Sequence, residues 1–182
     1  MKKKVKRIKW PTTDNYRELC EAARVTPDAA AYEYAGNKVT YGELLEQVNN
    51  LAAGFKRVNI KSGDSVIVIL PDIPQAIECY YAMEKESINV CTLHPGVKAA
   101  AVAVIADETD CRAIITVDDN YEEIAKAVAG LDHPVQIILA DINIKKPKSK
   151  IRKSILHKKA QKKYANDEHI TPWSKLMQYD HI

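Results

Sequence analysis

Apolar residues along most of this chain follow two alternating patterns. Short runs that are apolar nearly throughout have the length of β-strands, and between them apolar residues recur at the spacing of one helix face. The strand-like runs span residues 65–70, 88–93, 113–117 and 135–140, and the helix-like segments span residues 74–84, 97–106 and 121–129. Nearly continuous apolar strands that alternate with helices are typical of a parallel sheet covered on both faces. Because crossovers between parallel strands are right-handed, the pattern predicts an α/β fold with a doubly wound parallel sheet.

A helix and a β-hairpin are predicted ahead of this repeat. Thr13-Asp14 can cap a short helix, and the dipeptide Gly36-Asn37 suits a tight turn between two strands. The helix is expected over residues 16–23, and the hairpin strands over residues 30–34 and 38–41. The predicted fold is therefore a parallel sheet that a hairpin precedes.

Two of the predicted helices carry further signals. Thr40 and Glu43 have the spacing of a capping box, in which each side chain accepts a hydrogen bond from a backbone N–H at the helix start. Apolar residues then recur at one-face spacing, which predicts a helix to about Arg57. In the 74–84 segment the apolar face is expected to consist of Ile77, Tyr80 and Tyr81.

Charge divides the chain into three regions. Residues 1–10 contain six Lys or Arg and residues 145–163 contain ten, and neither segment contains an acid. These sixteen are most of the 27 basic residues, so the remaining eleven stand against all 24 acidic ones. We therefore divide the chain into a basic arm, an acidic α/β subdomain and a basic tail that ends in a short apolar cluster. Their bounds are residues 1–12, 13–142 and 143–182.

The basic tail has two interpretations. The simpler one is a solvated segment with no partner. The alternative is an anionic membrane surface, because lysines in residues 145–163 flank Ile151, Ile155 and Leu156, which lie loosely on one side of a helix. A nucleic-acid partner is not expected, since no aromatic side chains interleave with these lysines and the body is acidic.

The sequence predicts a cytoplasmic protein, with peripheral membrane association as the alternative for the tail. The longest apolar run, residues 99–106, is far shorter than the roughly 20 residues that cross a bilayer. The basic residues 1–9 are not followed by the apolar stretch of a secretory signal.

Cysteine and histidine give one candidate site residue. The four cysteines form no C-x-x-C pair, so we expect free thiols that mostly behave as small buried hydrophobes, and the histidines show no zinc-binding spacing. His94 follows the 88–93 strand, at the end where open α/β sheets usually bind ligands. We therefore take His94 as a candidate substrate-binding residue. The alternative is a histidine that Pro95 holds in a turn.

Several moderate motifs follow one another in a familiar order. They are YEYAGNKVTYGEL at residues 32–44, NLAAGF at 50–55, VNIKSGDSV at 58–66, LPDIPQA at 70–76, YYAMEK at 80–85 and VCTLHP at 90–95. Together they resemble the N-terminal part of the adenylate-forming, or AMP-binding, acyl-CoA synthetases. The His94-Pro95 pair is most similar to bacterial fatty acyl-CoA ligases. The resemblance covers about residues 14–140 and implies the N-terminal subdomain of the adenylate-forming fold.

The resemblance implies a function for the complete enzyme. Such enzymes convert a carboxylate, here a fatty acid, with ATP and CoA to an acyl-CoA, AMP and pyrophosphate. ATP, Mg and CoA are thus implied for the complete enzyme, and this part is expected to supply framework and some of the acyl-site wall.

The residues that perform this chemistry in the family are not in the sequence. Adenylation needs a Gly/Ser/Thr-rich phosphate loop, a ribose-binding Asp and a catalytic Lys, which in the family all lie further downstream. The six glycines of this chain are not clustered. We therefore expect a fragment that is truncated before the phosphate loop, has no catalytic residue, binds no cofactor and is inactive alone. Its expected partner is the remainder of the enzyme. The alternatives are a non-catalytic α/β binding module and a half-enzyme completed in trans by a second chain.

Overall fold

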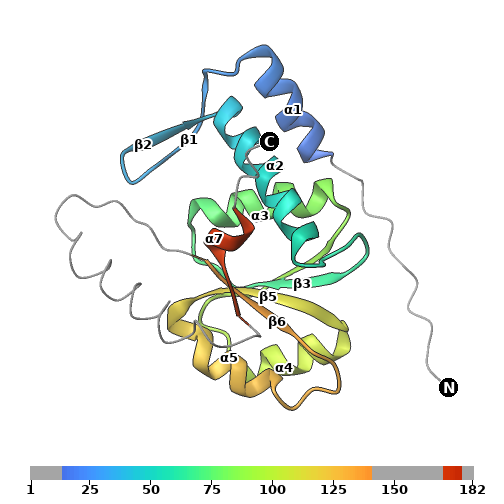
Figure 1. Cartoon of the computed structure of the whole chain (residues 1–182). Coiled ribbons are helices and arrows are strands. Elements are labelled where there is room, and N and C mark those ends of the chain that lie inside the picture. Colours follow the sequence, from blue (N-terminus) through green and yellow to red (C-terminus); the bar gives the residue numbers. More distant parts are fainter. Residues whose placement is uncertain (1–13, 141–169, 178–182) are drawn as a thin grey trace.

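The computed structural model describes residues 14–140 and 170–177 as one α/β structure (Figure 1). A parallel sheet forms the middle layer, with helices on both of its faces. The basic arm, residues 1–12, and most of the basic tail lie outside the described residues.

A helix and a hairpin precede the sheet. They are α1 (Asn15–Val25), β1 (Ala30–Tyr34) and β2 (Asn37–Thr40). The strands pair antiparallel, with Tyr34 opposite Asn37, so the turn consists of Ala35 and Gly36. The predicted turn, Gly36-Asn37, was therefore wrong by one residue. Both turn residues have positive φ, 51° and 78°, as a two-residue hairpin turn of the primed type requires. Ala35 adopts this strained backbone conformation because the register of the two strands places it in the turn.

Helix α2 (Tyr41–Arg57) begins at the predicted capping box. The Thr40 hydroxyl accepts from the Glu43 backbone N–H at 3.2 Å, and the Glu43 carboxylate accepts from the Thr40 N–H at 2.8 Å. Two N–H groups at the helix start, which have no partner within the helix, are thereby satisfied. The predicted start and end of this helix are both confirmed.

Five parallel strands form the sheet, in the spatial order β4-β3-β5-β6-β7. The strands are β3 (Ser65–Val68), β4 (Asn89–Thr92), β5 (Cys111–Val117), β6 (Gln136–Ala140) and β7 (Ile170–Pro172). The connecting helices are α3 (Pro74–Lys85), α4 (Ala99–Glu108) and α5 (Tyr121–Val128), the last preceded by the 3-10 turn η1 (Asp118–Asn120). The predicted doubly wound fold is confirmed.

Strand side chains alternate between two separate cores. In β5, Ala113 and Ile115 pack with α2 and α3 in one cluster, whereas Ile114 packs with α4 and α5 in the other. Strands β3 and β6 alternate in the same way. Because both faces are covered, these strands are apolar at nearly every position, which is the pattern that the sequence displays.

The apolar cluster near the end of the chain belongs to the α/β structure. Strand β7 pairs with β6, and α7 (Trp173–Leu176) packs on α2. Leu176 is fully buried, and its carbonyl accepts from the Arg57 guanidinium at 2.6 Å. A Cβ on Gly54 would overlap this carbonyl, so glycine permits the close approach of α7 to α2. Residues 170–177 of the basic tail therefore complete the sheet and one of its faces.

The buried face of α3 differs from the predicted one. Ile77 and Tyr80 were expected in the core, but they are 37% and 43% exposed. The side chains that α3 buries are Glu78, Cys79, Ala82 and Met83. The expected apolar face was therefore wrong at Ile77 and Tyr80, whereas Tyr81 is partly buried against the core. Helix α3 carries large apolar residues on more than one side, and its packing against α2 selects the buried one.

Candidate functional site

The carboxyl ends of β3, β4 and β5 meet where the winding of the sheet changes direction. From β3 the chain steps to β4 on one side and then returns past β3 to β5. Open α/β sheets bind ligands in the crevice at such a switch point. The loops that follow these three strands are therefore the candidate site of this chain.

His94 lies in the loop after β4, as predicted, and its side chain is exposed. Its Nδ1 accepts a hydrogen bond from the Gly96 backbone N–H at 3.0 Å. A Cβ on Gly96 would come within 3.2 Å of the same nitrogen, so the imidazole lies tightly over its own turn. One ring nitrogen is thus used locally, and only Nε2 remains for a ligand. The substrate-binding role of His94 stays a prediction.

Two side-chain hydrogen bonds near His94 were not anticipated from the sequence. The Asn120 amide, in the turn after β5, donates to the Pro95 carbonyl at 3.2 Å. This bond ties together the loops on either side of the switch point. The Tyr80 hydroxyl lies 2.9 Å from the Thr92 hydroxyl at the end of β4. Both contacts join residues that are distant in sequence, so no local spacing could reveal them.

A buried ionisable pair lies between the hairpin and α3. Glu78 is only 6% exposed, and burial raises the pKa of its carboxyl to about 7. Burial, together with the nearby Glu78, raises the pKa of the Tyr32 hydroxyl to about 12. Among the described residues this hydroxyl has no hydrogen-bond partner. The pair lies within the core on the α2 side of the sheet, so its effect is expected on stability. Sequence reasoning missed it because the apolar face of this helix was expected at Ile77, Tyr80 and Tyr81, and a carboxylate is seldom buried.

The four cysteines are free thiols in the structure. Cys79 and Cys111 are buried, and Cys20 and Cys91 are partly buried. Burial raises the pKa of Cys111 to about 11 and that of Cys79 well above its ordinary value. These two thiols therefore stay protonated and are poor nucleophiles. Within residues 14–140 and 170–177, no three His, Cys, Asp or Glu side chains gather where a metal ion could bind.

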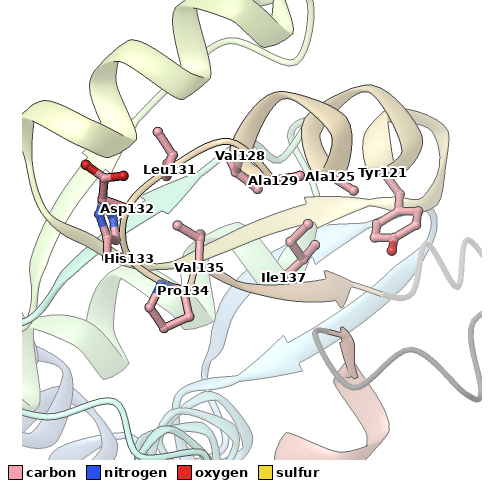
Figure 2. Close-up of a pocket in the computed structure, with 10 residues that line it drawn as sticks. All are labelled: Tyr121, Ala125, Val128, Ala129, Leu131, Asp132, His133, Pro134, Val135 and Ile137. Atoms are coloured by element: carbon pink, nitrogen blue, oxygen red, sulfur yellow. The ribbon is translucent and has the colours of Figure 1, made fainter.

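A groove of about 420 Å³ lies on the other side of the sheet, between α5 and β6 (Figure 2). Its floor is apolar, and Val135, just before β6, and Ile137 of β6 point toward Val128 and Ala125 of α5. His133 lies at one end, where its Nδ1 is 3.8 Å from the Asp110 carboxylate, and its Nε2 is buried without a partner among the described residues. The groove extends along α5 from His133, before the amino end of β6, to Tyr121, which follows Asn120 of the switch-point loop. No helix of the described residues is long and apolar enough to span a bilayer.

The sequence profile of one protein family, described as "AMP-binding enzyme", matches residues 19–174. The match covers most of the chain, from α1 into α7. It supports the resemblance noted in the sequence at the level of the family.

Curated relatives carry the name acetyl-coenzyme A synthetase. The chain is 35% identical to acetyl-coenzyme A synthetase 1 of Candida albicans over 111 residues, which are 58% of this chain and 16% of that enzyme. It is 36% identical over 84 residues to the acetyl-coenzyme A synthetase of Methanothrix soehngenii, covering 46% of this chain and 12% of that enzyme. The matched part is thus a small share of each relative.

Solved structures share the fold. A coronafacic acid ligase from Pectobacterium brasiliense superposes with a TM-score of 0.69 over 92% of this chain and 30% of its own, at 17% identity. A benzoate CoA ligase from Burkholderia xenovorans superposes with a TM-score of 0.64 over 69% of this chain and 25% of its own, at 14% identity. Identities this low establish the architecture and leave substrate open.

Proposed function

Because the chain belongs to the AMP-binding enzyme family, we propose that it supplies the N-terminal framework of an AMP-forming acyl-CoA synthetase. The complete enzyme would join a carboxylate to AMP with release of pyrophosphate, and then transfer the acyl group to CoA. The observation that carries this proposal is the family match over residues 19–174. It spans the whole doubly wound sheet, including β7.

The substrate in this proposal is a carboxylic acid. The His94-Pro95 pair favours a fatty acid, whereas the acetyl-coenzyme A synthetase names of the curated relatives favour a short one. We propose the short acid, since several stretches of sequence support it and the fatty acid rests on one dipeptide. ATP, Mg and CoA are the cofactors that the complete enzyme would use.

We propose that the isolated chain is inactive. Its sequence lacks a glycine-rich phosphate loop, whose backbone N–H groups would hold a triphosphate. The switch-point loops present an exposed imidazole and a carboxamide that is already engaged with Pro95. Neither group can stabilise the charge that develops on a reacting phosphate as a lysine or metal ion would.

A chimeric enzyme tests the framework role. Residues 19–140 of this chain would replace the equivalent residues of the Candida albicans acetyl-coenzyme A synthetase. We expect the folded chimera to form acetyl-CoA from acetate, ATP and CoA, with palmitate as the parallel substrate. A folded chimera without acetyl-CoA formation, next to an active parent enzyme, would count against the proposal. Acyl-CoA formation with palmitate alone would reverse the choice of acid.

The isolated chain provides the complementary assay. With ATP, Mg²⁺, CoA and either acid, it should release no pyrophosphate above the rate without acid. Release that depends on the acid would show that a catalytic site has been overlooked. If the chimera forms no acyl-CoA and the isolated chain releases no pyrophosphate, a non-catalytic binding module becomes the better description.

A further inference from the structure

The groove between α5 and β6 has the size and the walls of a small-molecule site. Its volume of about 420 Å³ falls within the range of roughly 300–1,000 Å³ that is usual for ligand pockets. Its walls are mainly apolar, with Ala125 and Val128 on α5 opposite Val135 and Ile137 (Figure 2). The groove follows α5, whose eight residues span about 12 Å. A short unbranched alkyl chain therefore fits along it.

Polar side chains gather at the end of the groove that precedes β6. Asp132 and His133 line this end, and Tyr121 lines the other (Figure 2). The His133 Nδ1 lies 3.8 Å from the Asp110 carboxylate. A proton on this nitrogen faces the carboxylate, which leaves Nε2 as an acceptor. Because Nε2 is buried and has no partner among the described residues, a ligand that donates a hydrogen bond here would satisfy it.

Charge at the same end selects the kind of donor. Asp132 and Asp110 place two carboxylates beside the imidazole. None of the described residues that line the groove is Lys or Arg, and Lys126 of α5, although exposed, is not a lining residue. A carboxylate ligand would meet like charge at this end. An ammonium group would meet opposite charge and carries N–H donors for Nε2.

From these observations we propose that the α5–β6 groove is a binding site for a primary alkylamine, held as its ammonium ion. The alkyl chain lies between Val128 and Ile137, and the ammonium group lies at the His133 end beside Asp132. The carboxylic acid of the proposed function has the wrong charge for this groove, so the groove is not the site of that acid. This inference goes beyond the proposed function and does not depend on it.

Three ligands with the same hexyl chain test the proposal on the full chain: hexylamine, 1-hexanol and hexanoate. Shifts of backbone amide signals in two-dimensional NMR spectra locate the binding and give the dissociation constants. We expect hexylamine to shift the amides of residues 121–137, which include every described lining residue. At low salt it should bind about tenfold tighter than hexanoate, because the carboxylates attract the one and repel the other. The neutral alcohol should lie between them.

Asp132→Asn is the variant for this experiment, since its exposed side chain can be changed without disturbing the core. It should reduce the preference for hexylamine over hexanoate about threefold, as the loss of one exposed charge pair allows. The matched control, Asp28→Asn at an exposed carboxylate ahead of β1, should leave the preference unchanged. Tightest binding of 1-hexanol would overturn the proposal in favour of a purely apolar cavity. Shifts outside residues 121–137, no saturable binding, or an equal preference in wild type and Asp132→Asn would overturn it as well.

Discussion

On the α2 side of the sheet, three helices and the returning α7 enclose the strands, whereas on the α5 side two helices leave a groove. Val66, Ala113 and Ile115 on the first side are completely buried. On the second side Val128 and Ile137, although mostly buried, line an open volume of about 420 Å³. The described residues therefore close one face of the sheet, and on the other face they leave a groove.

The two sides also differ in the polar groups that they bury. The α2 side holds the Glu78 carboxyl and the Tyr32 hydroxyl. The α5 side holds the hydroxyl of Thr116, which is fully buried and has no partner among the described residues. Burial shifts the pKa of the Glu78 carboxyl to about 7, so we expect the closed side to contribute a pH dependence to stability.

The largest expected effect is that pH dependence. Glu78 titrates at about 7 in the folded chain and at an ordinary 4.5 when unfolded, so the folded state retains a proton that the unfolded state releases. The corresponding stability is fully present below pH 4.5, declines as pH rises to 7 and stays lost above. The shift corresponds to a loss on the order of 3 kcal/mol. Urea unfolding at pH 5 and pH 8 measures it.

Glu78→Gln is the matched variant for this experiment. Its free energy of unfolding should lack this decline, because the amide does not titrate. The nearby Tyr32 and Cys79 titrate far above the window and cannot replace the effect. An equal decline in wild type and variant would assign the pH dependence to other groups.

The next effect compares one substitution on the two sides. Val48→Ala, at a fully buried position of α2, should lower the free energy of unfolding by about 2–3 kcal/mol. Val128→Ala beside the groove should cost less, about 1 kcal/mol, because this side chain already borders an open volume and its truncation creates less of a new cavity. Urea unfolding of both variants measures the two costs. Equal costs at Val48 and Val128 would mean that the two sides are packed equally tightly.

Two glycines give a similar contrast. Gly54→Ala should cost about 1–3 kcal/mol, because the new methyl group would displace the Leu176 backbone and with it α7. Gly130→Ala, after α5, meets no atom within 4 Å and should change stability by less than about 0.5 kcal/mol. Thermal unfolding followed by circular dichroism compares the two. A neutral Gly54→Ala would show that α7 contributes little to the closed side.

The smallest effect concerns how the helices begin. Thr40→Ala removes the hydroxyl that caps α2 and should cost about 1 kcal/mol. Helix α5 has no side-chain cap, since the Asn120 side chain donates to Pro95 instead. Asn120→Ala should therefore affect the loops at the switch point rather than α5. Urea titration of both variants, with far-ultraviolet circular dichroism for helix content, distinguishes these outcomes.

Much of this architecture could be predicted because it depends on local rules. Strands β3, β5 and β6 are buried on both faces, so their apolar runs mark them directly. The capping box at Thr40 and Glu43 fixes the start of α2 within four residues of sequence. The family resemblance likewise consists of short motifs read in order, and the profile match supports it.

What could not be predicted depends on contacts between distant residues. Glu78 in the core and α7 against Gly54 are each imposed by a partner far along the chain. The strained turn at Ala35 depends on the exact register of the two hairpin strands, which the sequence pattern left uncertain by one residue. Strand β7 and helix α7, with three and four residues, are too short to show a period. At the candidate site, the position of His94 could be predicted from the strand that precedes it. The hydrogen bond that its Nδ1 accepts from the Gly96 N–H could not be predicted.

The late arrival of β7 has a consequence for synthesis of the protein. Its first residue, Ile170, leaves the ribosome thirty residues after Ala140, the last residue of β6. At about 5–20 residues per second, this gap lasts roughly 1.5–6 s. During that interval the described residues provide no strand for the edge of β6 that later pairs with β7, and β6 contains the buried side chains Ile137 and Ile138. A nascent chain in this state exposes an apolar, uncharged strand edge to other chains. We therefore expect the chain to be prone to aggregation in the interval before residue 170 emerges.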